Sequence, residues 1–313
     1  MSNAIEIYDW IVVVVYLLLL LVLTLSLSNT NKKRDDIFLA GRSMKRWPVS
    51  LSLYMAVFST ISFLGVIGWL NEENGTIWIG LQNIGIVMAV PFVVWLYPSL
   101  FYKLNLTTAY EYLERRFNYT IRALGASFFL GARIMWLSTM LYAGSLLVSI
   151  MFNLTPESGM EYGQVWILVG IVSVSVFLGA VGGMRAIIWT DVIQFFILMG
   201  SVLLMGIIAI SEIGGVGEFL QIANESGKFS PPAFFSFTDN LSIISGLLLG
   251  VVSMLYSGGA DQVILQTYLT AKSAKESKRS LKLSGYAIKP VSYTHLTLPT
   301  TSALCRCRWS AVV

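Results

Sequence analysis

The chain has 313 residues, of which 56% are hydrophobic and only 12% are charged, and its mean hydropathy is +0.72. Soluble proteins carry about 25% charged residues. This composition therefore excludes an ordinary soluble domain and predicts an all-α polytopic membrane protein. The net charge of +4 and the pI of about 9.0 reflect basic loops between apolar segments, so we expect no nucleic-acid partner.

Seven apolar stretches are long enough to cross a bilayer core of ~30 Å, which takes about 20 helical residues. In chain order they are 8–28, 48–70, 77–101, 124–152, 165–181, 187–210 and 241–265, and an eighth begins near Leu283. The first stretch is too long for a cleaved signal, has no basic flank before it and carries Asp9 at its start. We therefore count it as a span.

The loops between these spans differ sharply in charge. Alternate loops, at 30–48, 103–122, 182–186 and 272–282, hold 16 basic residues, whereas the opposite loops hold only Lys228. We expect the protein to lie in the plasma membrane or the inner membrane. The positive-inside rule then places the basic loops in the cytoplasm and the N-terminus on the outer side of that membrane. The stretch 107–118 has a capping threonine and an apolar face, which predicts an amphipathic helix on the cytoplasmic membrane surface.

The second span contains a dense group of hydroxyl side chains, including Ser59, Thr60 and Ser62, followed by Gly65 and Gly68. Hydroxyls bond back to their own helix and small residues allow close packing of helices. The same pattern also marks a helix that is broken near the membrane midplane, where free carbonyls bind an ion and a helix end faces a solute. Both interpretations remain open from the residues alone.

Three further polar groups lie within predicted spans: Gln82, Arg133 and the pair Asp261-Gln262. A buried glutamine more often makes a hydrogen bond between helices than a ligand contact. Arg133 lies well inside its span without an acidic residue within one turn, so it must snorkel, pair or face a hydrated cavity. We treat these residues as candidate solute ligands beside the structural alternative.

Asp191 is the most informative residue of the chain. It follows Gly182-Gly183 and precedes an almost wholly apolar run, so its charge lies one turn inside a membrane-spanning segment. Placing an ionised carboxylate at such depth costs roughly 2.5–3.5 kcal/mol on insertion scales. Asp191 is therefore either a helix-start charge at headgroup level or a carboxylate that lines a path for a cation.

The tail from residue 291 does not continue this pattern. Ser292–Thr300 reads as the translation of a sequencing adapter, so we expect residues 1–290 to be a transporter fragment and 291–313 to be a non-native scar. This removes His295, Cys305 and Cys307, leaving 1–290 without histidine or cysteine. We therefore expect no enzyme, because histidine-based acid/base and thiol chemistry lose their residues.

Five motifs in the same order resemble the sodium:solute symporter family. They are 36–42 and 58–65 around the first core helix, 110–118 after the second, 182–194 at the fourth-to-fifth junction, and 261–273 at the sixth helix. The resemblance implies a truncated five-plus-five inverted-repeat sodium symporter fold with an extra leading helix. A chain that ends one helix into the second repeat is expected not to transport by itself.

The family resemblance also implies roles for individual residues. Sodium is the co-transported ion: the backbone carbonyls of Met55 and Phe58 are expected to bind it, Asp191 matches a carboxylate on its inner route, and hydroxyls of an absent eighth core helix would complete the site. Asp261 stands where the family often has a solute-contacting asparagine, and Ser62 replaces the glutamine or glutamate of some sugar and vitamin carriers.

These departures favour an organic acid over a sugar as the small-molecule solute, with Arg133 as its counter-charge. The alternative function is a solute-sensing input module of a signalling protein, which a signalling domain after the spans would reveal. Besides the solute and the lipid bilayer, we expect no obligate protein partner.

Overall fold

Helices make up nearly all of the described structure, as the composition predicts. The computed structural model describes residues 7–28, 34–58, 68, 75–152, 162–236 and 241–288. Its elements are α1 (Ile7–Leu27), α2 (Arg34–Leu39), η1 (Ala40–Arg42), α3 (Arg46–Met55), η2 (Ile77–Gly80), α5 (Leu81–Lys103), α6 (Ala109–Arg116), α7 (Tyr119–Met151), α8 (Gly163–Ile213), α9 (Val216–Glu225), α10 (Ile243–Gly259), α11 (Gln262–Leu269), α12 (Ala274–Leu283) and η4 (Ser284–Ile288).

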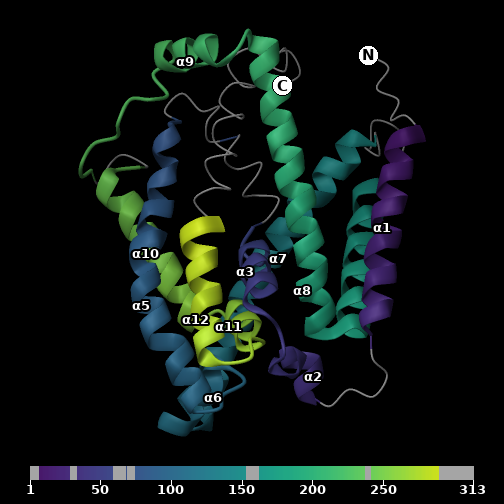
Figure 1. Cartoon of the computed structure of the whole chain (residues 1–313), viewed down its shortest axis with the longest axis vertical. Helices are drawn as coiled ribbons and strands as arrows, with labels where there is room; N and C mark the ends of the chain where they lie inside the picture. Colours follow the sequence, from purple (N-terminus) through teal and green to yellow (C-terminus); the bar gives the residue numbers. More distant parts are fainter. Residues whose placement is uncertain are drawn as a thin grey trace.

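Four helices, α1, α5, α7 and α8, are long and apolar enough to cross a membrane, and the bent pair α10–α11 is a fifth candidate. Two facts explain the difference from the seven predicted spans. The 51-residue α8 contains two of the predicted spans. The predicted span 48–70 continues past Phe58 into residues that the structure does not describe. Figure 1 shows α9 at one end of the molecule and α2 and α6 at the other, which fits the predicted alternation of loops.

A glycine divides α8 where the sequence predicts the short turn between two spans. Gly183 has φ 64° and ψ −176°, which an L-residue with a side chain rarely adopts. Beside it, a Cβ on Gly182 would lie 2.8 Å from the Thr24 Cγ2 of α1, so this turn also needs a small residue for packing. The break lets α8 fold back on itself along α1 (Figure 1).

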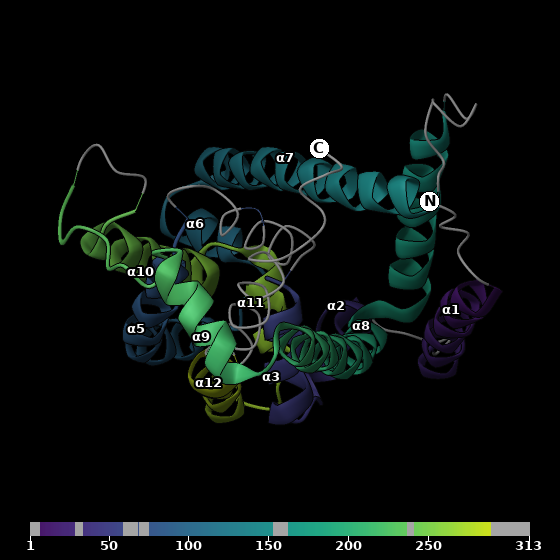
Figure 2. The same cartoon turned by 90° about the horizontal axis from the view of Figure 1, so that it is seen from above.

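The closest helix pairing joins α5 and α10, which lie side by side in both views (Figures 1 and 2). A Cβ added to Gly250 would lie 2.0 Å from the backbone oxygen of Gln82, and one added to Gly85 would lie 2.1 Å from that of Leu247. Glycine therefore permits backbone-to-backbone contact at this seam, a device common between membrane helices. In the view from above, α7 runs along the edge of the molecule that lies opposite α3 and α12 (Figure 2).

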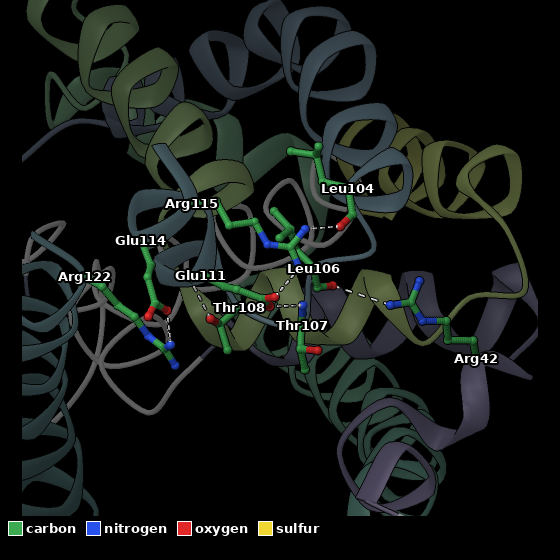
Figure 3. A network of polar contacts seen from close by, with 9 residues as sticks. All are labelled: Arg42, Leu104, Leu106, Thr107, Thr108, Glu111, Glu114, Arg115 and Arg122. Atoms are coloured by element: carbon green, nitrogen blue, oxygen red, sulfur yellow. Dashed lines mark hydrogen bonds and ion pairs between the residues drawn. The ribbon is translucent and has the colours of Figure 1, made fainter. Parts of the chain in front are cut away.

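A polar network fastens the predicted amphipathic helix, which the structure confirms as α6 (Figure 3). Thr108 caps it by accepting from the Glu111 N–H at 3.1 Å, and the Glu111 carboxylate accepts from the Thr107 N–H. Arg115 pairs with Glu111 and donates to the Leu104 carbonyl at 2.8 Å. Burial raises the pKa of Glu111, but the Thr107 and Arg115 hydrogen bonds outweigh it and leave that pKa below its usual value.

The segment before α3 is tied to the end of α11 at the same end of the molecule. The Met44 N–H donates to the Thr270 carbonyl at 3.1 Å, and the Tyr102 hydroxyl donates to the Ala271 carbonyl at 2.7 Å. The Arg42 guanidinium lies 5.3 Å from the centre of the Tyr102 ring. These contacts fix the start of α3 and the end of α11 relative to each other.

Candidate functional site

The first candidate site forms where α10 gives way to α11, with a bend of 59°. The seventh span was predicted as one apolar stretch, and the structure instead breaks it at Ala260-Asp261. Asp261 is the N-cap of α11: its Oδ1 accepts from the Val263 N–H at 2.8 Å and the Ile264 N–H at 3.4 Å. A carboxylate suits this position because it satisfies helix N–H groups and the positive end of the helix dipole.

Arg133 reaches this break from α7. Its Nη1 lies 3.8 Å from the Asp261 Oδ2, and both side chains are mostly buried, with exposed fractions of 25% for Arg133 and 12% for Asp261. The distance exceeds the 2.7–2.9 Å of a charge-assisted hydrogen bond. The two residues singled out separately by sequence are thus brought together, in an ion pair without a direct hydrogen bond.

Two more polar side chains lie around the break, both linked to α6. The Tyr110 hydroxyl donates to the Ala260 carbonyl at 3.1 Å, and burial raises the pKa of that phenol far above its ordinary value, with Tyr256 and Asp261 adding to the effect. The Gln262 amide donates to the Thr107 carbonyl and accepts from the Ala109 N–H, both at 3.2 Å. Gln262 therefore holds the start of α6 in this structure, and its role as a solute ligand stays a prediction.

The second candidate site surrounds Asp191, on the limb of α8 after the Gly183 break. Asp191 follows that glycine by eight residues, about 12 Å along a helix axis. Its carboxylate accepts a hydrogen bond from the buried Ser52 hydroxyl of α3. Nearby, Tyr16 of α1 shares a side-chain hydrogen bond with Gln194 and interacts electrostatically with Asp191. The structure thus packs Asp191 against α3, and its place on a cation path stays a prediction.

The end of α3 lies close to this carboxylate. α3 ends at Met55, three residues or about 4.5 Å along the axis from Ser52. The Tyr54 carbonyl accepts from the Val57 and Phe58 N–H groups, whereas within the described residues no N–H donates to the carbonyls of Met55 or Phe58. Carbonyls at a helix C-terminus carry partial negative charge, so Met55 and Phe58 stay candidate sodium ligands beside Asp191.

The remaining predicted ligands are not joined to these two sites. Gln82 lies in the first turn of α5, half-buried, and no contact in the described ranges links it to Arg133 or Asp261. Ser59, Thr60 and Ser62 lie outside the described residues.

Sequence reasoning gave no site role to Ser52, Tyr16, Gln194 or Tyr110, although Tyr110 and Gln194 belong to the motifs 110–118 and 182–194. A further signal was available for Ser52, which belongs to the hydroxyl-rich start of the second span and precedes Met55 by about one helical turn. The other three act through partners on distant segments, which their own surroundings in the sequence do not indicate.

A profile of the sodium:solute symporter family matches residues 37–291. The chain is 30% identical over 252 residues to the sodium/sialic acid symporter of Aliivibrio fischeri, covering 80% of this chain and 48% of that protein. It is 30% identical to the sodium-dependent multivitamin transporter of Oryctolagus cuniculus, covering 84% and 39%, and 26% identical to the sodium/glucose cotransporter of Vibrio parahaemolyticus, covering 82% and 47%. It therefore spans about half or less of the length of the curated relatives it matches.

A solved structure of a Na+-coupled sialic acid symporter, in a substrate-bound outward-open state, superimposes with a TM-score of 0.85 at 24% identity. The match covers 98% of this chain and 62% of that one. It confirms the predicted fold class. The relatives carry acids, vitamins and sugars by name, so similarity alone does not choose a solute.

Proposed function

Because the chain belongs to the sodium:solute symporter family, we propose that the full-length protein containing it couples sodium entry to the uptake of a small organic solute. A transporter family also agrees with the prediction that the protein is not an enzyme. Sodium is here a substrate that moves with the solute. The proposed location is the cell or inner membrane, with the basic loops in the cytoplasm and the N-terminus outside.

The sodium part of the proposal rests on Asp191, Met55 and Phe58. A carboxylate near the carbonyls at a helix end supplies the hard oxygen ligands and negative potential that a small cation requires. The hydrogen bond from Ser52 orients the carboxylate and leaves its negative charge in place. Asp191 would then attract sodium, and the carbonyls of α3 would replace part of its water shell.

The solute part of the proposal is an organic acid, and the Arg133–Asp261 contact is the observation that carries it. Arg133 is a mostly buried cation beside the break of α10–α11, and its guanidinium is not held by a direct hydrogen bond to Asp261. Broken helices near the midplane are where such carriers bind their solutes. A planar guanidinium suits a carboxylate better than it suits a neutral sugar.

Substitution of Arg133 tests this choice of solute. Uptake of labelled pyruvate, sialic acid and glucose would be measured in cells that express the full-length protein. Arg133→Gln should raise the half-saturating concentration of the transported acid about tenfold to a hundredfold, because a hydrogen-bonded charge contributes roughly 1.5–3 kcal/mol. Arg133→Lys keeps the positive charge but loses the planar guanidinium that can donate two parallel hydrogen bonds to a carboxylate. Its effect on the half-saturating concentration should therefore be smaller.

The control for this series is Arg279→Gln, which removes a cation paired with Glu276 on α12 and should leave uptake of the acid unchanged. Preferred uptake of glucose, or wild-type affinity for the acid in Arg133→Gln, would return Arg133 to a structural role.

A further inference from the structure

We propose that Asp261 is an internal competitor of the solute for Arg133, and that the pair selects solutes with a single negative charge. The inference rests on the proposed anion binding at Arg133 and adds a residue that sets its strength. In the empty protein the two opposite charges, 3.8 Å apart, make the break nearly neutral. A carboxylate from outside would then have to share Arg133 with Asp261 or displace it.

The surroundings of Asp261 allow it to give up Arg133. Its Oδ1 already accepts two N–H groups at the start of α11, while the more distant Oδ2 faces the guanidinium. The helix cap and the helix dipole stabilise the aspartate charge without help from Arg133. Loss of Arg133 to a solute therefore does not leave Asp261 as an unsatisfied buried anion, which would otherwise be costly.

Arg133 is equally suited to the exchange. It comes from α7, which packs mainly against α6 and α8 rather than against the α10–α11 pair that carries Asp261. Within the described residues, Asp261 is its one ion-pair partner. A solute carboxylate that binds both guanidinium nitrogens at hydrogen-bond distance would gain contacts that the 3.8 Å pair does not make.

The pair also limits the charge of the solute. One carboxylate beside Arg133 and Asp261 leaves the site with a net charge of −1, and a second carboxylate would bring it to −2 in surroundings where charges are weakly screened. We therefore infer that singly charged acids are preferred over doubly charged ones. Removal of the Asp261 charge should strengthen acid binding and weaken this preference.

The test is uptake of labelled pyruvate by the full-length protein with Asp261→Asn, using malonate as a doubly charged inhibitor. Asparagine is as good an N-cap as aspartate, so the start of α11 should persist. The half-saturating pyruvate concentration should fall at least about tenfold, since even a pair of unit charges near 4 Å in water interacts by an energy close to that of a tenfold change. Inhibition by malonate should strengthen by more than that. In the Arg133→Gln background, Asp261→Asn should lower the half-saturating pyruvate concentration less than it does in the wild type, because the release of Arg133 from Asp261 no longer contributes.

Two further variants keep the test decisive. Glu276→Gln removes an acid on the surface of α12, paired with Arg279, and should change neither inhibition nor uptake. If Asp261→Asn fails to reach the membrane, Asp261→Glu keeps the charge and extends it toward Arg133, so the half-saturating pyruvate concentration should rise. Carboxylate uptake with unchanged or weaker affinity in Asp261→Asn, or with unchanged affinity in Asp261→Glu, would overturn this inference alone. Wild-type uptake of glucose but of no carboxylate would overturn it together with the proposed solute.

Discussion

Asp191 and Ser52 show how a single charge is managed inside an apolar protein. The carboxylate lies where its ionised form is expensive, and within the described residues it accepts from one hydroxyl of α3 and forms no ion pair. A carboxylate that is only partly satisfied keeps its ability to attract a cation. A lysine or arginine at the place of Ser52 would neutralise it permanently.

Asp191→Asn should therefore raise the half-saturating sodium concentration of uptake by the full-length protein about tenfold to a hundredfold, since the lost attraction is worth one to a few kcal/mol. Ser52→Ala should shift it in the same direction but less. The matched control is Glu212→Gln, an exposed acid near the other end of α8. Equal sodium dependence in wild type and Asp191→Asn would refute the role of Asp191.

At the scale of helices, the seam between α5 and α10 is the strictest packing constraint. Gly250→Ala would place a methyl group 2.0 Å from the Gln82 backbone oxygen, which cannot move aside as a flexible side chain can. We expect a loss of roughly 1–3 kcal/mol from overpacking. It would appear as a lower unfolding temperature in detergent and reduced expression.

Gly131→Ala provides the control for this seam, because a Cβ on Gly131 of α7 would meet no atom within 4 Å. Alanine also has the higher helix propensity, so this change should be neutral or slightly stabilising. Equal stability of Gly250→Ala and Gly131→Ala would contradict the close contact of α5 and α10.

The capped start of α6 predicts a dependence of stability on pH. The pKa of Glu111 is lower in the folded protein than its ordinary value, so its contribution is fully present above that ordinary value and is lost as pH falls through the folded pKa. Thermal unfolding in detergent at decreasing acidic pH should show this loss. Glu111→Gln should be less stable at neutral pH and less sensitive to acid, and an unchanged acid sensitivity would contradict the network of Figure 3.

Some of these elements were predictable from sequence and others were not. The Gly182-Gly183 turn can be predicted from sequence, because two glycines followed by a polar turn interrupt an apolar run. The break at Asp261 also follows two glycines, Gly258-Gly259, but the apolar length of 241–265 predicts a single span across them. Arg133, Asp261 and Asp191 could each be singled out by the cost of a charge in a membrane, but their partners depend on how distant helices pack. Local periodicity carries no information on that packing.

At the scale of the whole molecule, orientation in the membrane is the main proposal still to be tested. Residues 1–290 contain no cysteine, which makes single-cysteine labelling straightforward once any other cysteine is removed. Asn224→Cys in α9 should react with a membrane-impermeant maleimide on intact cells. Lys275→Cys in α12 should react only after the membrane is opened. The reverse pattern would invert the proposed topology.

The central claim is that sodium entry drives uptake of an organic acid, and proteoliposomes containing the full-length protein test it most directly. An inward sodium gradient should drive accumulation of labelled pyruvate or sialic acid above its external concentration, and an equal potassium gradient should not. The Asp191→Asn variant should need a higher sodium concentration for the same accumulation. The Arg133→Gln variant should need a higher concentration of the acid. Accumulation of the acid that does not depend on the sodium gradient would contradict the account. Accumulation of glucose but of neither acid would contradict it as well.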